Sequence, residues 1–259
     1  MTKKSTSLVL KTRHYRWFPP QDHFGYKEQI TDHKKNDTAL MLVDVYLPDQ
    51  YDPGRPEEEQ YSSLSAKDYA LWRRKIEQGI IPVVRAARSA AIPIIYVCNA
   101  NIEIGMQHSA YAKKIEQSLG FQVEEAFEEI ELESERKEPL AGSLNFLDGV
   151  APQKGDYFIG KTVYSGFFNT ALDSLLRNLQ VKTLITAGFR LDACLLGTVL
   201  DALYRNYQVI LIRDATLACE LPNEIDAQQF TERMTLHFEA LIGDSMLSED
   251  FIRSCNEIS

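Results

Sequence analysis

The stretch "TLITAGFRLDACLLGTVLDALYRNYQVILIRD" (residues 183–214) decides the fold class. Two β-rich apolar runs, at 183–188 and 208–214, enclose a helical pattern at 194–206. A strand, a helix and a second strand in this order form a right-handed crossover between parallel strands. The stretch therefore predicts a parallel sheet with at least one helix packed on it.

The same alternation extends toward the N-terminus. Further strands are predicted at 38–45, 93–99 and 156–161, and helices at about 80–91, 167–179 and 223–242, the last with Asn223 as its N-cap. We therefore predict an α/β three-layer sandwich: a mostly parallel six-stranded sheet with helices on both faces. Residues 1–36 show little periodicity and are expected to form an N-terminal arm. Residues 37–259 would form the domain, with an insertion at about 100–155.

Composition narrows the functional classes. The 259 residues are 44% hydrophobic and 25% charged, as in ordinary globular proteins, and the net charge is −9. An acidic chain is a poor general nucleic-acid binder, because phosphate neutralisation needs clustered Lys and Arg. No apolar run is long enough for a signal peptide or a membrane span. The four separated cysteines suit reduced thiols, so we expect a cytoplasmic protein that binds neither nucleic acid nor membrane.

One short motif suggests nucleotide binding. The letters "GDYFIGKT" (155–162) match the phosphate-loop pattern G-x-x-x-x-G-K-[ST]. A phosphate loop needs a strand before its first glycine and a helix at its lysine. Here the strand lies between the glycines, and the next helix is predicted to begin only at about Phe167. The match is therefore interpreted as accidental, and a nucleotide hydrolase remains a minor alternative.

Three polar residues follow strand ends in the predicted sheet. Asp44 closes the first of the predicted strands, Lys161 closes the third, and Cys194 opens the helix after the fourth. Ligands of such sheets bind beyond the carboxyl ends of the strands. Cys194 could be a small buried hydrophobe, as most free cysteines are. It could equally be a nucleophile, with Lys161 favouring the thiolate and Asp44 carrying the proton.

Two longer segments resemble a known family. "ALMLVDV" (39–45) and "GKTVYSGFFNTALDSLLRNLQVKTLITAGFRLDACLLGTVLDALYRNYQVILIRDAT" (160–216) are similar to the isochorismatase-like cysteine hydrolases, and the similarity covers roughly residues 38–250. The resemblance implies the catalytic triad Asp44, Lys161 and Cys194. The stretch from Lys161 is most similar to members that cleave ureidoacrylate and related ureido or carbamoyl compounds. It thus implies a cysteine-dependent amidohydrolase with a thioester-type intermediate, which forms homo-oligomers.

The chain also departs from the family pattern. The usual threonine three positions before the cysteine is Leu191, and the next residue is Asp192 instead of asparagine. The non-proline cis peptide common in the family would fall at Phe189–Arg190. These differences leave the exact substrate open, and a non-catalytic binding module on the same fold remains the alternative.

Several further residues are candidates for binding the substrate. Asn99 could hydrogen-bond a ureido group, and Arg190 could anchor a substrate carboxylate, although a surface or intersubunit ion pair is the more common role of an arginine. The full set of expected substrate-binding residues is Asn99, Tyr164, Phe167, Arg190 and Leu191.

No metal or other cofactor is expected. Related nicotinamidases carry an Asp-x-His metal site after the second strand, where this chain has "NAN" (99–101). The five histidines do not pair at ligand spacing.

Overall fold

The computed structural model describes residues 6–18, 24–48, 54, 56, 65–100, 109–119 and 144–258. Of the predicted insertion at 100–155, residues 101–108 and 120–143 lie outside the described residues. Its described part includes helix α4 (Ala110–Leu119). Nowhere in the described ranges is there a helix with the length and apolar character that crossing a membrane requires.

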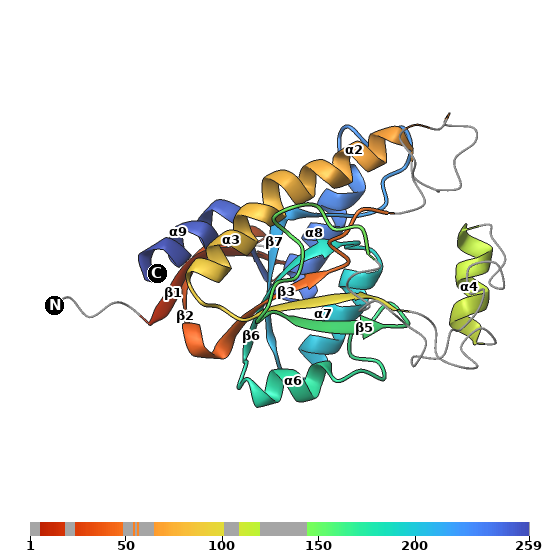
Figure 1. Cartoon of the computed structure of the whole chain (residues 1–259). Coiled ribbons are helices and arrows are strands. Elements are labelled where there is room, and N and C mark those ends of the chain that lie inside the picture. The colour runs from red at the N-terminus through yellow and green to blue at the C-terminus, as the bar shows by residue number, and fades with distance from the viewer. Residues whose placement is uncertain are drawn as a thin grey trace.

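A single eight-stranded sheet organises the molecule (Figure 1), in the order β2-β1-β8-β7-β6-β3-β4-β5. The six strands from β8 to β5 are mutually parallel, as predicted. Two antiparallel strands at the β8 edge raise the number from the predicted six to eight. The strands are β1 (Ser7–Arg16), β2 (Gly25–Lys34), β3 (Thr38–Val43), β4 (Ile94–Asn99), β5 (Tyr157–Lys161), β6 (Thr183–Phe189), β7 (Gln208–Leu217) and β8 (Asp244–Met246).

Helices cover both faces of the sheet, which confirms the three-layer prediction (Figure 1). On one face, α2 (Ala66–Lys75) continues through a π-helical turn (Ile76–Ile80) into α3 (Ile81–Ser89), beside α9 (Ser248–Ile258). On the other face lie α6 (Leu172–Asn178), α7 (Cys194–Tyr204) and α8 (Gln229–Leu241). Each face of the sheet has its own apolar core, because alternate residues of a strand point to opposite faces.

Two helices begin later than the sequence pattern predicts. Helix α8 begins at Gln229, not near Asn223, because the carboxylate of Glu220 accepts hydrogen bonds from the backbone N–H groups of Phe230 (3.0 Å) and Thr231 (2.8 Å). This distant carboxylate satisfies amides that a local N-cap would otherwise serve. Helix α6 begins at Leu172 instead of residue 167.

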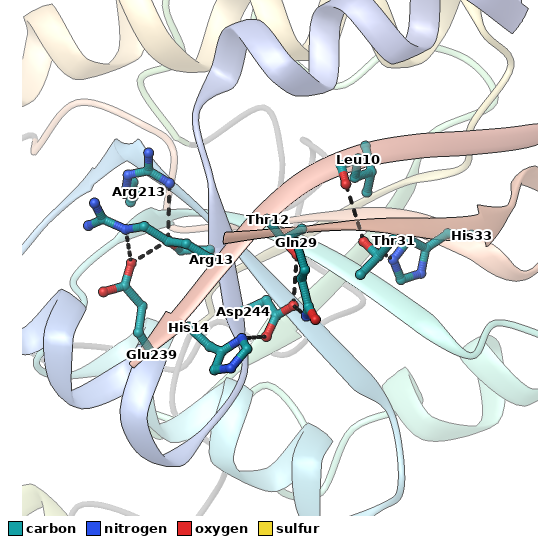
Figure 2. A network of polar contacts seen from close by, with 11 residues as sticks. Leu10, Thr12, Arg13, His14, Gln29, Thr31, His33, Arg213, Glu239 and Asp244 are labelled. Atoms are coloured by element: carbon teal, nitrogen blue, oxygen red, sulfur yellow. Dashed lines mark hydrogen bonds and ion pairs between the residues drawn. The ribbon is translucent and has the colours of Figure 1, made fainter. Parts of the chain in front are cut away.

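Residues 1–36, in which the sequence shows little periodicity and which it predicts to form an arm, contain two long strands in the described part of the segment. Strands β1 and β2 pair over ten residues each, and β1 joins the sheet beside β8. Figure 2 shows the polar contacts that attach them: Thr12 Oγ1 and Gln29 Nε2 donate to Asp244 Oδ2 at 2.8 and 2.7 Å, and Arg13 Nε lies 2.7 Å from Glu239 Oε1. The partners are more than 200 residues away in sequence, so local patterns could not reveal them.

Candidate active site

Three strand ends bring the predicted triad together. Asp44 directly follows β3, with a left-handed backbone (φ 49°) that Asp adopts more readily than most residues. Lys161 is the last residue of β5, and Cys194 is the first residue of α7, after β6. Because β3, β5 and β6 are parallel, their carboxyl ends lie at one edge of the sheet.

The ammonium group of Lys161 joins the other two residues. Lys161 Nζ lies 2.9 Å from Asp44 Oδ2 and donates a hydrogen bond to Cys194 Sγ at 3.2 Å. The side chain of Lys161 has no solvent exposure, and Asp44 is 4% exposed. Buried charges are found in proteins when they are paired, so this lysine and aspartate stabilise one another.

Asn99 and Tyr46 complete the polar contacts around the triad. Asn99, at the end of β4, donates its backbone N–H to Asp44 Oδ1 at 3.1 Å, and its side-chain oxygen accepts from Lys161 Nζ. The amide nitrogen of Asn99 donates to Tyr46 Oη at 2.8 Å, and Tyr46 Oη donates to Asp44 Oδ1 at 3.3 Å. Asp44 is therefore held by contacts from two neighbouring strands and from the loop that follows β3.

The charges of the triad set its resting protonation. Burial, and then the charge of Asp44, raise the pKa of Cys194 to about 12, although Lys161 acts in the opposite direction. Burial disfavours the charged form of Lys161, but Asp44 and Cys194 outweigh it, and the pKa of this lysine is raised. The resting site thus holds a neutral thiol beside a protonated lysine.

The start of α7 offers a place for an oxyanion. The backbone N–H groups of Ala193 and Leu195 both donate to the carbonyl of Arg190, and that of Leu191 donates to Leu217. No acceptor for the backbone N–H of Cys194 lies among the described residues. The first N–H groups of a helix lack intrahelical partners, so this donor can bind developing negative charge.

Gly188 allows two strands to approach next to the site. A Cβ at this position would lie 2.0 Å from the carbonyl oxygen of Val43, the residue before Asp44. Its φ of +113° is also one that side chains rarely adopt. The following Phe189–Arg190 peptide bond is cis, at the position that the family resemblance indicated.

Three of the expected substrate-binding residues differ in exposure: Tyr164 lies partly at the surface, whereas Phe167 and Leu191 are buried. Tyr164 is 38% exposed, and its ring packs edge-to-face with Tyr111 of α4 at 5.0 Å between centroids. Thr198 Oγ1 donates to the backbone carbonyls of both Tyr164 (3.3 Å) and Cys194 (2.8 Å), so Tyr164 lies beside the start of α7. Burial, and then the charge that Cys194 carries as a thiolate, raise the pKa of both tyrosines. Phe167 and Leu191 are buried in the core on the α7 side of the sheet, where Phe167 packs against Tyr207.

Arg190 does not point freely into the site. Its Nη2 lies 3.2 Å from Asp192 Oδ2, so the guanidinium already has a carboxylate partner. The other oxygen of Asp192 accepts from the backbone N–H of Cys219 at 3.1 Å. A substrate carboxylate would therefore compete with Asp192 for this arginine.

Sequence reasoning missed Tyr46 and Tyr111. Tyr46 lies two residues after Asp44, and this spacing was a usable signal. Tyr111 comes from the predicted insertion, where no pattern indicates contact with the site.

The phosphate-loop interpretation of residues 155–162 does not hold. Lys161 pairs with Asp44, and the next helix begins only at Leu172, so these residues do not form a phosphate loop. In the described part of the chain, no three His, Cys, Asp or Glu side chains gather as metal ligands.

A parallel sheet with a buried Asp–Lys–Cys cluster at the carboxyl ends of its strands is the arrangement of an α/β enzyme. Comparison with known proteins identifies the family. The family model described as the isochorismatase domain matches residues 69–244, more than half of the chain. The chain therefore belongs to the isochorismatase family, which confirms the resemblance seen in the sequence.

Curated relatives and solved structures agree with this assignment. The ureidoacrylate amidohydrolase RutB of Serratia proteamaculans is 33% identical over 193 residues, which are 70% of this chain and 69% of that protein. The RutB of Methylobacterium radiotolerans is 34% identical over 150 residues, and the chain spans only about half (53%) of its length. A cysteine hydrolase from Pseudomonas syringae has the same fold, with a TM-score of 0.61, 22% identity and coverage of 87% of this chain and 95% of that one.

Proposed function

We propose that the protein is a cysteine-dependent amidohydrolase that cleaves a C–N bond of a small ureido or carbamoyl compound. The observation that carries the proposal is the placement of Lys161 Nζ between Asp44 Oδ2 (2.9 Å) and Cys194 Sγ (3.2 Å). A buried carboxylate, ammonium and thiol at the start of a helix are the groups that nucleophilic acyl transfer needs.

The first half of the reaction breaks the C–N bond. Asp44 accepts the thiol proton of Cys194, and the sulfur attacks the substrate carbonyl carbon. The resulting oxyanion is stabilised by the backbone N–H of Cys194 and by a neighbouring amide in 190–193. When the tetrahedral intermediate collapses, the C–N electron pair leaves with the nitrogen, which takes the proton from Asp44.

The second half returns the enzyme to its resting state. Water attacks the carbonyl carbon of the thioester-linked carbamoyl group while Asp44 takes a proton from that water. The C–S bond breaks, carbamic acid leaves and gives its remaining proton to solvent to become carbamate, and the proton on Asp44 returns to the sulfur. Lys161 stays protonated throughout and offsets the negative charge that moves between Asp44 and Cys194.

Ureidoacrylate is the leading candidate for the substrate. Its support comes from the names of the RutB relatives and from the similarity of the segment that begins at Lys161. Tyr164, beside the start of α7, and Tyr111, packed against it, provide flat apolar surface that suits a planar conjugated compound. Arg190 can bind the substrate carboxylate if Asp192 releases it.

Intact-protein mass spectrometry with a panel of ureido, carbamoyl and simple amide compounds tests the proposal. Release of ammonia and amine would be followed in parallel. We expect turnover of a ureido compound, with an adduct that is lost in Cys194→Ala. The matched control is Cys219→Ala, because Cys219 is exposed and outside the triad. Full turnover by Cys194→Ala would refute the mechanism, and inactivity across the whole panel would favour a binding module.

A further inference from the structure

Through a single hydroxyl group, Tyr46 contacts one member of the triad, Asp44, and the neighbouring Asn99. Tyr46 Oη lies 3.3 Å from Asp44 Oδ1 and 2.8 Å from Asn99 Nδ2. Asn99 Oδ1 in turn accepts from Lys161 Nζ, which pairs with Asp44 Oδ2. The four side chains therefore form a closed ring of polar contacts.

The donors and acceptors in this ring have a fixed direction. A carboxylate only accepts hydrogen bonds, so the hydroxyl of Tyr46 must donate to Asp44. Its oxygen is then available to accept from Asn99, which requires the amide nitrogen to face Tyr46. The amide oxygen of Asn99 consequently faces Lys161, which can only donate.

Packing holds the tyrosine in this place. The backbone carbonyl of Tyr46 accepts a hydrogen bond from Trp72 Nε1 at 3.1 Å, and its ring packs edge-to-face on Phe146 at 6.0 Å. Burial, and then the charge of Asp44, raise the pKa of Tyr46 above its usual range. The hydroxyl therefore stays protonated and remains a donor at every pH at which the protein would work.

We propose that Tyr46 is a positioning residue for the triad: it occupies Asp44 Oδ1, so that Oδ2 faces Lys161, and it fixes the amide of Asn99 with its oxygen toward Lys161. The inference rests on the proposed function, because positioning matters only if Asp44 moves a proton. Tyr46 itself touches no reacting atom in this scheme and exchanges no proton with the substrate.

The surroundings of Asp44 make the role testable by pH. Among the described residues, the titratable groups that face or act on its carboxylate are Lys161 from β5, Cys194 from α7, the buried thiol of Cys98 from β4, Tyr111 from α4, and Tyr46. Unlike Lys161 and Cys194, Tyr46 can be changed to a residue of the same shape that lacks only the polar atom, and unlike Tyr111 it donates a hydrogen bond to Asp44. Tyr46→Phe keeps the ring and removes one donor from a charged carboxylate.

The experiment compares Tyr46→Phe with wild type in steady-state kinetics across pH. We expect kcat to fall by about tenfold with little change in KM, because a misdirected carboxylate affects proton transfer more than binding. The acid limb of the kcat/KM profile should move to higher pH, because the charged carboxylate has lost a hydrogen bond. A profile that coincides with that of wild type would overturn the inference.

Tyr96→Phe is the matched control. Tyr96 is also a buried tyrosine whose ring packs on Phe146 at 6.0 Å, but its hydroxyl donates to the carbonyl of Val150, outside the site. Losing this hydroxyl should lower stability without moving the pH profile. If both variants moved the limb equally, the effect of Tyr46 would be structural and the inference would fail.

A second measurement needs no substrate and separates the two proposals. The rate of Cys194 carboxamidomethylation by iodoacetamide is followed from pH 7 to 9 in wild type, Tyr46→Phe and Tyr96→Phe. We expect at least about threefold slower modification in Tyr46→Phe. A carboxylate that has lost a hydrogen bond should raise the pKa of the Cys194 thiol further, so a smaller fraction of the thiol is ionised and reactive. If wild type turns over no ureido compound, the proposed function fails, whereas equal alkylation rates would refute the role of Tyr46 alone.

Discussion

Lys161 Nζ lies 3.2 Å from Cys194 Sγ, and the lysine that makes this contact is completely buried. The same ammonium group pairs with Asp44 at 2.9 Å. A fully buried lysine that bridges a carboxylate and a thiol is costly to maintain unless the pairing is complete. The arrangement thus concentrates charge at the place where the proposed reaction needs it.

Replacing this lysine should abolish turnover. Lys161→Met keeps an unbranched side chain but leaves Asp44 and Cys194 without a cation, and we expect kcat to fall by roughly 10³-fold. Steady-state kinetics on the best ureido substrate would measure the loss, with circular dichroism as a check on folding. Lys154→Met, at an exposed position before β5, is the control and should retain activity.

The thiol should be sluggish in the free enzyme. Because the pKa of Cys194 is raised to about 12, the thiolate fraction is small at neutral pH and grows by about tenfold per pH unit. We expect the rate of alkylation to keep rising from pH 7 to 10 without a plateau. Peptide mapping of the alkylated Cys194 measures this rate, and a plateau below pH 8 would contradict the resting protonation described above.

Arg190 should distinguish charged from uncharged substrates. Arg190→Gln is expected to raise KM by about tenfold for a ureido compound that carries a carboxylate, with little effect on an uncharged one. Asp192→Asn should have the opposite effect on KM, because it releases the guanidinium from its present partner. Equal changes for both substrates would mean that Arg190 does not contact the carboxylate.

Gly188 should tolerate no side chain. Gly188→Ala would place a Cβ 2.0 Å from the carbonyl oxygen of Val43, so β3 and β6 would have to separate. We expect a loss of more than about 3 kcal/mol in the free energy of unfolding. Gly155→Ala is the matched control, since it has a similar φ of +104° but no atom within 4 Å, and it should cost only about 1 kcal/mol. Urea denaturation measures both.

The N-terminal hairpin should contribute to the stability of the whole domain. Arg13→Ala would leave Glu239, whose side chain is fully buried, without its 2.7 Å partner (Figure 2). A buried carboxylate that has lost its cation, and keeps a hydrogen bond from Ser245 Oγ, is expected to cost about 3 kcal/mol. Lys67→Ala removes a solvent-exposed ion pair with Asp226 and should change the urea midpoint little. Similar midpoints for the two variants would show that the hairpin is not coupled to the sheet.

Much of the site was predictable because its residues follow strands that are readable locally. The run 38–45 predicted β3 and therefore placed Asp44 at its end, and the same reasoning placed Lys161 and Cys194. A strand pattern extends over only a few residues, so the sequence specified both the element and the residue that terminates it.

The sequence by itself determined five of the eight strands, β3 to β7, several of the helices that connect them, the parallel character of the sheet and the three residues at the carboxyl ends of its strands. Only the tertiary structure decided how β1 and β2 join the sheet, how Glu220 caps α8, and how Tyr46 and Asn99 surround Asp44. The physical reason is range. Periodicity and capping act between near neighbours in sequence. Most of these contacts instead join residues from 10 to more than 200 positions apart, and even the short-range contact of Tyr46 with Asp44 depends on Asn99 from a neighbouring strand, so their geometry exists only once the layers have packed.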